Sequence, residues 1–130
     1  MNARRVALCV AVIALCSACN GVREVAGTLR ELQQVQRAVS KVVGSDNVSV
    51  NVNNGKYLTI GLVNTPLKEL PAAQKKAKAL EVAALAYRSY PSKSSVTDVN
   101  VVFVVRRSYL MVFNYTDATD VFMFSASELS

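Results

Sequence analysis

All three cysteines of this 130-residue chain, Cys9, Cys16 and Cys19, lie near its start, and their placement constrains how the rest is stabilised. The chain after Cys19 has no cysteine, so no disulfide can form within it. Small exported domains often depend on disulfides. A domain without them must bury enough apolar surface to be stable through its core alone. The helices and strands of this chain must therefore supply a complete apolar core.

The first residues have the order of an export signal. Arg4 and Arg5 precede a continuous apolar run at residues 6–15, and small residues follow it. A transmembrane helix needs about 20 apolar residues, so this run is too short to span a bilayer. A basic start, a short apolar centre and small residues after it are typical of a secretory signal peptide. We therefore predict that residues 1–18 direct export and are removed.

The junction Leu15-Cys16-Ser17-Ala18-Cys19 resembles the lipobox of bacterial lipoproteins. Ser17 and Ala18 are the small residues before the cut, and Cys19 matches the cysteine that receives a diacylglycerol. Cys16 stands where the family usually has leucine. The resemblance implies cleavage before Cys19, acylation there with chains such as palmitate, and anchoring to a membrane. An ordinary signal peptide cut near Ala18 and an uncleaved anchor are the alternatives.

This resemblance divides the chain into a signal peptide at residues 1–18, a lipidated cysteine with a short tether at 19–21, and a single domain at 22–130. It implies an exported protein that is lipid-anchored to the cell envelope. Asn20 is not the aspartate that commonly retains lipoproteins at the inner membrane. We therefore expect the outer membrane, facing the periplasm, if the cell is Gram-negative.

Two helices are predicted. Apolar side chains recur at helical spacing through residues 22–43, in a stripe of Val22, Val25, Leu29, Leu32, Val39 and Val43. We expect this stripe to pack in the core, and a partner-binding or membrane-lying helix is the alternative. A second helix at residues 71–89 is expected to pack through Ala73, Ala77, Leu80, Ala84 and Tyr87.

Alternating apolar residues predict a hairpin at residues 48–63 with an Asn-Gly turn. A two-residue loop would place the apolar residues of its two strands on opposite faces. We therefore expect a three-residue loop at 53–55 that pairs Val50 with Leu58. Gly55 would then take the left-handed conformation of a bulged turn.

The C-terminal part of the sequence is rich in β-forming residues, and strands are predicted at 96–105, 109–116 and 121–125. Arg106 and Arg107 are expected to lie at a turn, residues 117–120 in a loop, and 127–130 in a frayed tail. The element order α-β-β-α-β-β-β predicts an α+β fold. It is a two-layer sandwich, with two helices packed on one face of a mostly antiparallel sheet.

Residues 29–105 resemble a BON domain, a small module of exported bacterial proteins. The order helix, hairpin, helix, strand is shared. Matching features are "VSVNV", the turn glycine Gly55, Gly61 in "LTIGLV", the helix "QKKAKALEVAALA", and the valines Val96 and Val99 in "VTDVNVVFVV". The Pro66 to Pro71 segment and the strands after residue 109 depart from the family's pattern. The resemblance implies binding to phospholipid or to envelope proteins.

Several kinds of chemistry are absent from the sequence. It contains no histidine, the residue most used for acid–base catalysis and for binding metals. Asp117 and Asp120 are close in sequence, but hydrogen bonding within a turn explains them better than a carboxylate pair. No phosphate-binding or nucleophile-elbow motif occurs. We expect no catalysis, metal, cofactor or small-molecule substrate, and an enzyme with a shallow Ser/Lys site is the least favoured hypothesis.

Five cations are the candidate contacts for lipid headgroups or for a partner: Lys75, Lys76, Lys78, Arg106 and Arg107. A solvated helix face and a solubilising turn are the alternative interpretations. Loss of the signal peptide reduces the formal charge from +6 to +4, an excess that suits an anionic membrane or an acidic partner. Nucleic acid is not expected, because the chain has no dense basic run.

We therefore predict a non-catalytic lipoprotein of the bacterial cell envelope. Its lipid anchor would attach it to the membrane, and its small BON-like domain would bind envelope phospholipid or protein. The alternative is a structural or assembly accessory, such as a pilot lipoprotein of an envelope or secretion complex. An exposed apolar face on the first helix, or an unpaired edge strand, would favour that alternative.

Overall fold

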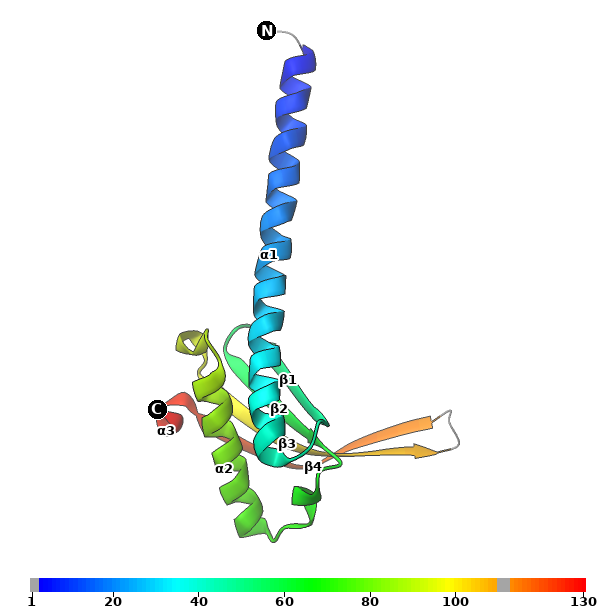
Figure 1. The fold of residues 1–130 in the computed structure, drawn as a ribbon, viewed down its shortest axis with the longest axis vertical. Helices are drawn as coiled ribbons and strands as arrows, with labels where there is room; N and C mark the ends of the chain where they lie inside the picture. Colours follow the sequence, from blue (N-terminus) through cyan, green and yellow to red (C-terminus); the bar gives the residue numbers. More distant parts are fainter. Residues whose placement is uncertain (1–2, 110–112) are drawn as a thin grey trace. The chain divides into compact units, whose positions relative to one another are not determined.

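The computed structural model describes residues 3–109 and 113–130 and confirms the α+β class (Figure 1). The chain divides into two compact units, Met1–Arg30 and Glu31–Ser130. The elements are α1 (Ala3–Val43), β1 (Val48–Asn53), β2 (Tyr57–Val63), the 3-10 helix η1 (Pro66–Glu69), α2 (Ala72–Ser89), the 3-10 helix η2 (Lys93–Ser95), β3 (Asp98–Tyr109), β4 (Phe113–Ser125) and α3 (Ala126–Leu129).

From Ala3 onward the first unit belongs to α1, whose bounds also include residues 31–43 of the second unit. This helix includes residues 19–21, where the sequence predicts a tether. No helix among the described residues has both the length and the apolar character needed to cross a membrane. Cleavage before Cys19 and lipidation at Cys19 stay predictions.

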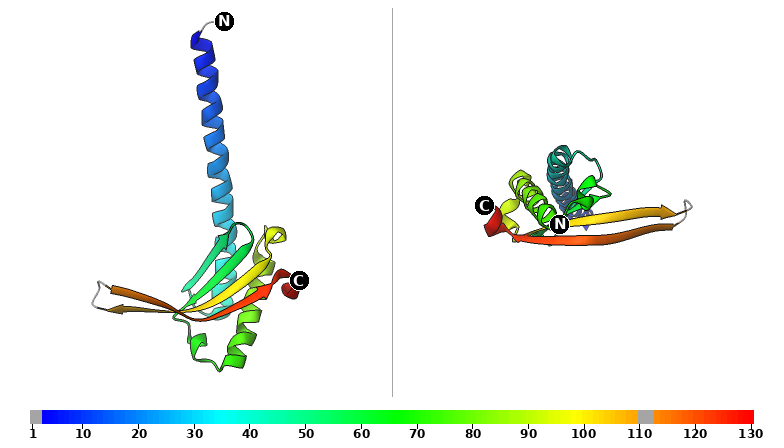
Figure 2. Two further views of the ribbon diagram at one scale, coloured as in Figure 1. Left: turned by 180° about the vertical axis from the view of Figure 1, so that it is seen from behind. Right: turned by 90° about the horizontal axis from the view of Figure 1, so that it is seen from below.

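The second unit contains a four-stranded sheet in the order β1-β2-β3-β4. β1 pairs with β2 and β3 pairs with β4 in antiparallel fashion, whereas β2 and β3 are parallel. Parallel neighbours need a crossover connection, and α2 provides it. The part of α1 in the second unit and α2 lie on one face of the sheet, and no described helix lies on the other (Figure 2). The expected placement of two helices on one face is therefore correct.

The first hairpin forms with the expected faces but a different register. Val50 pairs with Ile60, two residues beyond the predicted Leu58. Asn54 and Gly55 both have positive φ, as an Asn-Gly turn requires, and the loop runs from Asn54 to Lys56. A shift of two residues keeps every side chain on its face, so the alternation alone did not distinguish these registers.

The C-terminal strands differ from the prediction. The segment at residues 117–120, expected to be a loop, lies inside β4, so the two predicted strands are one. A register irregularity between Phe103 and Val104 of β3 leaves Thr119 of β4 as an extra residue. A bulge of this kind absorbs a local mismatch without ending the strand. The polar composition that predicts a loop is thus accommodated by a bulge.

The second predicted turn is also in a different place. Arg106 and Arg107 lie within β3, opposite Thr116 and Tyr115, rather than at a turn. β3 and β4 continue past the last residue pair between β2 and β3 as a two-stranded ribbon (Figure 2). The sequence between β3 and β4 lies outside the described residues.

The core lies between the two helices and the sheet. Its buried apolar residues are Val35, Val39, Val48, Leu58, Ile60, Leu62, Ala79, Val82, Ala83, Ala86, Tyr90, Val96, Val99, Val101, Phe103, Phe124 and Leu129. In α1, the apolar stripe is buried or half-buried at Leu32, Val39 and Val43, but Val25 and Leu29 are exposed. The expected core stripe is therefore correct for its last three members and wrong for Val25 and Leu29, and the side chain of Val22 lies outside the described residues.

The packed face of α2 differs from the predicted one. Ala79, Val82, Ala83 and Ala86 are buried, whereas Leu80 of the predicted face is 42% exposed. Because alanine occurs on several sides of this helix, composition did not identify the side that faces the sheet. The observed face has the spacing i, i+3, i+4, i+7.

The C-terminal tail is ordered into α3 instead of being frayed. Ser125 and Glu128 form a capping box, in which the Ser125 N–H donates to Glu128 Oε2 at 2.8 Å. Leu129 is buried in the core. The pattern Ser-x-x-Glu is a known start signal for a helix. This pattern is present in the sequence, but a segment of four residues is too short to show helical periodicity.

Candidate functional site

Lys75, one of the five candidate cations, is directed toward the sheet. It extends the packed face of α2 by one turn, since it precedes Ala79 by four residues. Its Nζ lies 2.7 Å from Asp120 Oδ2 of β4 and 5.6 Å from the centroid of the Phe103 ring. The Lys75 side chain is only 13% exposed. Lys75 therefore joins α2 to the sheet and is not free to bind a headgroup.

The other two lysines of α2 lie closer to solvent. Lys78 Nζ forms an ion pair of 2.8 Å with Glu81 on the same helix. Lys76 is exposed and has no ion pair with a described residue. Of the three lysines, Lys76 is the exposed one, and its charge adds to the hydrogen bonds from Ser125 that lower the pKa of Glu128.

Arg106 and Arg107 are exposed on the β3 part of the ribbon. The main chain of Arg106 is held by the side chain of Asn64, which follows β2. The Arg106 N–H donates to Asn64 Oδ1 at 2.9 Å, and Asn64 Nδ2 donates to the Arg106 carbonyl at 2.9 Å. Asn64 has a φ of 49°, a left-handed conformation that asparagine tolerates. Its amide thus extends the β2–β3 pairing after β2 has ended.

The structure places the five cations in different settings rather than in one basic patch. The three lysines differ in direction and pairing, and the two arginines lie on the ribbon. A concentrated positive surface is the feature that attracts anionic lipid. The described residues give little support for such a surface at these positions. Cys19, the predicted lipidation site, lies in α1, and its side chain is outside the described set.

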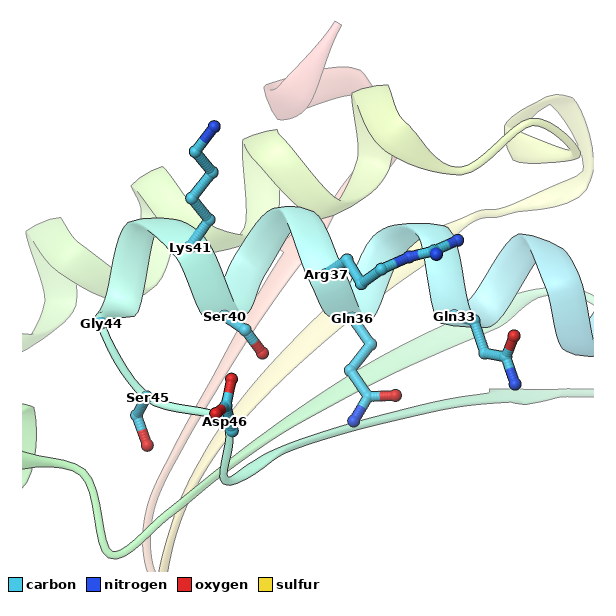
Figure 3. Close-up of a pocket in the computed structure, with 8 residues that line it drawn as sticks. All are labelled: Gln33, Gln36, Arg37, Ser40, Lys41, Gly44, Ser45 and Asp46. Atoms are coloured by element: carbon cyan, nitrogen blue, oxygen red, sulfur yellow. The ribbon is translucent and has the colours of Figure 1, made fainter.

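An open groove of about 690 Å³ lies beside the end of α1 (Figure 3). Its lining consists of Gln33, Gln36, Arg37, Ser40, Lys41, Gly44, Ser45 and Asp46. Gln33 and Gln36 point toward the sheet, whereas Lys41 points away from it (Figure 3). Small-molecule sites are usually lined mainly by apolar and aromatic side chains. This polar lining therefore does not favour a small-molecule site.

Gln36 has a structural role at the edge of this groove. Its Nε2 donates a hydrogen bond of 2.8 Å to the carbonyl of Val48 in β1. In the hairpin, the carbonyl of Asn47 accepts from Val63, so the main chain of Val48 is directed away from β2. Gln36 therefore covers an outward carbonyl at the free edge of β1.

Two described groups have shifted pKa values, and neither lines the groove. Burial, with a smaller contribution from the charge of Glu31, raises the pKa of the Tyr90 phenol. The main-chain N–H and the hydroxyl of Ser125 lower the pKa of Glu128, with a minor contribution from Lys76. Both shifts are explained by packing and helix capping. Within the described parts of the chain, no group of histidine, cysteine, aspartate and glutamate side chains is arranged to hold a metal ion.

The face of the sheet opposite the helices carries apolar side chains. We call this the open face, and its apolar members are Tyr57, Val63, Val102, Val104, Val121 and Met123. Val121 and Met123 of β4 are 59% and 66% exposed. Gly61 lies here opposite Ser49, and a Cβ at position 61 would collide with Ser49 Oγ. Asn100, in the middle of β3, has a covered Oδ1 without a hydrogen-bond partner.

Apolar surface on one face of a two-layer domain needs an explanation. Single exposed apolar residues are normal, but a contiguous group often marks an interaction surface. Here Val102 lies opposite Val121, and Val63 opposite Val104, so the group is continuous across three strands. The sequence alternates valines on both sides of β3, and this alternation does not show which side is uncovered.

No protein-family model, curated protein or solved structure matches the chain.

Proposed function

We propose that this chain is a non-catalytic lipoprotein of the bacterial cell envelope, anchored through Cys19, whose domain binds an envelope protein through the open face. The anchor rests on the sequence Leu15-Cys16-Ser17-Ala18-Cys19. The binding role rests on one observation, the continuous apolar group on the uncovered side of the sheet. The resemblance to BON domains is consistent with this role.

The charges near the open face favour protein over phospholipid as the ligand. Its exposed side chains on β4, Val121 and Met123, are uncharged. Of the five candidate cations for headgroup binding, Lys75 and Lys78 are paired with acidic side chains, and the three exposed ones do not form one basic patch. The described β4 part of this face is apolar and without charge, as is typical of the centre of protein interfaces, where charged residues are depleted.

Photo-crosslinking in living cells tests the binding role. Tyr57 lies on the open face and is 42% exposed, so p-benzoylphenylalanine can replace it with little change of shape. The matched control places the same amino acid at Tyr87 of α2. We expect a discrete protein adduct from position 57 and none from 87, and at least a tenfold loss of the adduct when Thr59→Lys adds a charge to the open face. Equal adducts from both positions, or none from either, would contradict the proposal, and an adduct only with lipid would favour the phospholipid hypothesis.

The anchor has a separate test. Mass spectrometry of the mature N-terminus should find Cys19 as the first residue, carrying acyl chains. A Cys19→Ser variant should leave the membrane fraction, because acyl chains contribute about 0.8 kcal/mol per buried CH₂ to membrane binding. An intact Met1, or a mature terminus without acyl groups, would exclude the lipoprotein assignment.

A second candidate function, an assembly accessory, is favoured by two observations: an exposed apolar stripe on α1, and an outer strand, β4, with no described strand beyond it. Val25 and Leu29, one helical turn apart, are 62% and 54% exposed. A helix with such a stripe can lie in the apolar groove of a partner. Crosslinking from position 25, with no adduct from position 57, would favour this function over the first.

A further inference from the structure

The outer edge of β4 has unpaired main-chain groups. The Ala126 N–H donates to the Thr97 carbonyl, and this hydrogen bond sets the alternation along β4. Residues 120, 122 and 124 therefore direct their main chain toward β3, and Val121 and Met123 direct theirs away from it. No described strand lies beyond β4. The N–H and C=O groups of Val121 and Met123 are thus available to another strand.

This available edge is short and sharply bounded. The extra residue Thr119 interrupts the strand on one side. On the other side, the Ser125 N–H is already bonded to Glu128, and the chain turns into α3. Residues 120–124 remain between them. Proteins commonly protect such edges with lysine or proline, and neither occurs in this segment.

We propose that two copies of this chain pair through residues 120–124 of β4 in antiparallel orientation, about a two-fold axis at Phe122. In this register Val121 lies opposite Met123 of the second copy, and Met123 opposite its Val121. Both pairs are of the hydrogen-bonded type, so every outward N–H and C=O of Val121 and Met123 finds a partner. A register centred on Met123 would instead require the Ser125 N–H, which Glu128 already occupies.

The side chains in this register are complementary. Val121 and Met123 lie on the open face in both copies, so the two cross-strand pairs join the apolar groups into one surface. On the helix side, half-buried Phe122 faces its own counterpart, beside its edge-to-face contact with Phe103. Asp120 faces Phe124 rather than another acid, and Lys75 already neutralises it. No like charges are opposed along the segment.

A second copy fits this edge better than an unrelated strand for a geometric reason. A two-fold axis makes the contact isologous, so each copy both offers and receives the same groups. The available segment has an odd number of residues with its outward groups placed symmetrically about Phe122. The bulge and the cap limit the paired segment to residues 120–124, and the contact closes at two copies because it uses the β4 edge of both. This inference is independent of the lipid anchor and of the partner proposed above.

Disulfide trapping tests the pairing directly. The full chain is used with its three native cysteines replaced by alanine, which also removes the lipid anchor. In a non-hydrogen-bonded antiparallel pair the Cα atoms are about 4.5 Å apart, within the range for a disulfide. Phe122→Cys should therefore form an intermolecular disulfide at least tenfold faster than Asn51→Cys, an exposed control on β1. Equal rates would overturn the proposal.

Two proline substitutions test the dimer independently, in case Phe122→Cys perturbs the fold. Met123→Pro removes only an outward N–H, so the single chain should fold while the dimer should dissociate with at least a tenfold higher Kd. Val52→Pro removes the equivalent outward N–H on β1 and should leave the Kd unchanged. Sedimentation equilibrium measures both, and circular dichroism checks folding. A wild-type chain that stays monomeric, or a dimer that Met123→Pro does not weaken, would overturn the inference.

Discussion

The two edges of the sheet are constructed differently. β1 is six residues long, carries Ser49, Asn51 and Asn53 on its solvent side, and has an outward carbonyl covered by Gln36. β4 is thirteen residues long and exposes Val121 and Met123. A polar, covered edge resists pairing with other chains, whereas an apolar free edge invites it. The contrast indicates that one edge is protected and the other is available for contact.

The two edges also differ in how their positions are fixed. β1 is held to α1 by one neutral hydrogen bond from Gln36, in addition to its apolar packing. β4 is held by the buried Phe103, by the ion pair between Lys75 and Asp120, and by the capping box that follows it. The available edge therefore has the more extensive support, which keeps its main-chain groups in position for a partner.

The largest effect is expected from the core beneath β4. Phe103→Ala removes a fully buried ring and should lower the free energy of unfolding by about 3–5 kcal/mol. Val50→Ala, at a half-buried position of β1, should cost only about 1 kcal/mol. Urea unfolding measures both. Equal losses would show that the two edges depend on the core to the same extent.

The two partners of the ion pair between α2 and β4 should contribute different amounts to the free energy of unfolding. Asp120→Ala leaves the ammonium of Lys75, a side chain only 13% exposed, without its ion-pair partner and should cost about 1–3 kcal/mol. Lys75→Met keeps an apolar stem against Phe103 and leaves an Asp120 that is 38% exposed, so it should cost less than about 1 kcal/mol. Thermal or urea unfolding of the two variants decides the order. A larger loss for Lys75→Met would contradict this explanation.

Removing the Gln36 side chain, which bonds to the edge of β1, should have a smaller effect on the free energy of unfolding. Gln36→Ala deletes the hydrogen bond to Val48 and should cost about 1 kcal/mol. Hydrogen exchange should show faster opening of β1 and unchanged protection of β3. Gln34→Ala, at an exposed position of the same helix, is the matched control and should be neutral. An unchanged β1 in Gln36→Ala would mean that this side chain does not protect the edge.

The smallest effect is expected from pH at the end of β4. The pKa of Glu128 is lowered in the folded chain, so its contribution to stability is present above the ordinary glutamate pKa. It is lost as the pH falls through that ordinary value toward the lowered one. The Ser125 amide resonance should then shift and its exchange should accelerate. Glu81→Gln should leave this transition in place, while Glu128→Gln should remove it.

Much of the fold was predictable because local patterns and burial agreed. The alternation in residues 48–63 and the Asn-Gly turn predict a hairpin, and the hairpin forms. Its register was wrong by two residues, since such a shift keeps the same side chains on the same faces. The loop predicted at residues 117–120 was wrong for a related reason. Residues 117–120 prefer a turn locally, but pairing with β3 keeps them in β4, and a bulge accommodates the mismatch.

The candidate site was less predictable. The sequence identified Lys75, Lys76 and Lys78 by charge, but their spacing did not reveal that Lys75 belongs to the packed face. That face depends on how α2 is rotated against the sheet. The open face was also not recognised, because both sides of β3 carry valines and the number of covering helices decides which side stays uncovered.

By itself, the sequence determined the α+β class, the two-helix layer and the dependence on a disulfide-free core. These follow from hydrophobic periodicity and cysteine placement, which are local properties of the chain. Only the tertiary structure decided that Lys75 meets Asp120, that Gln36 covers β1, and that β4 is left free. Each of these depends on which distant segments become neighbours. That choice is made by the packing of the whole core, and no single stretch of sequence contains it.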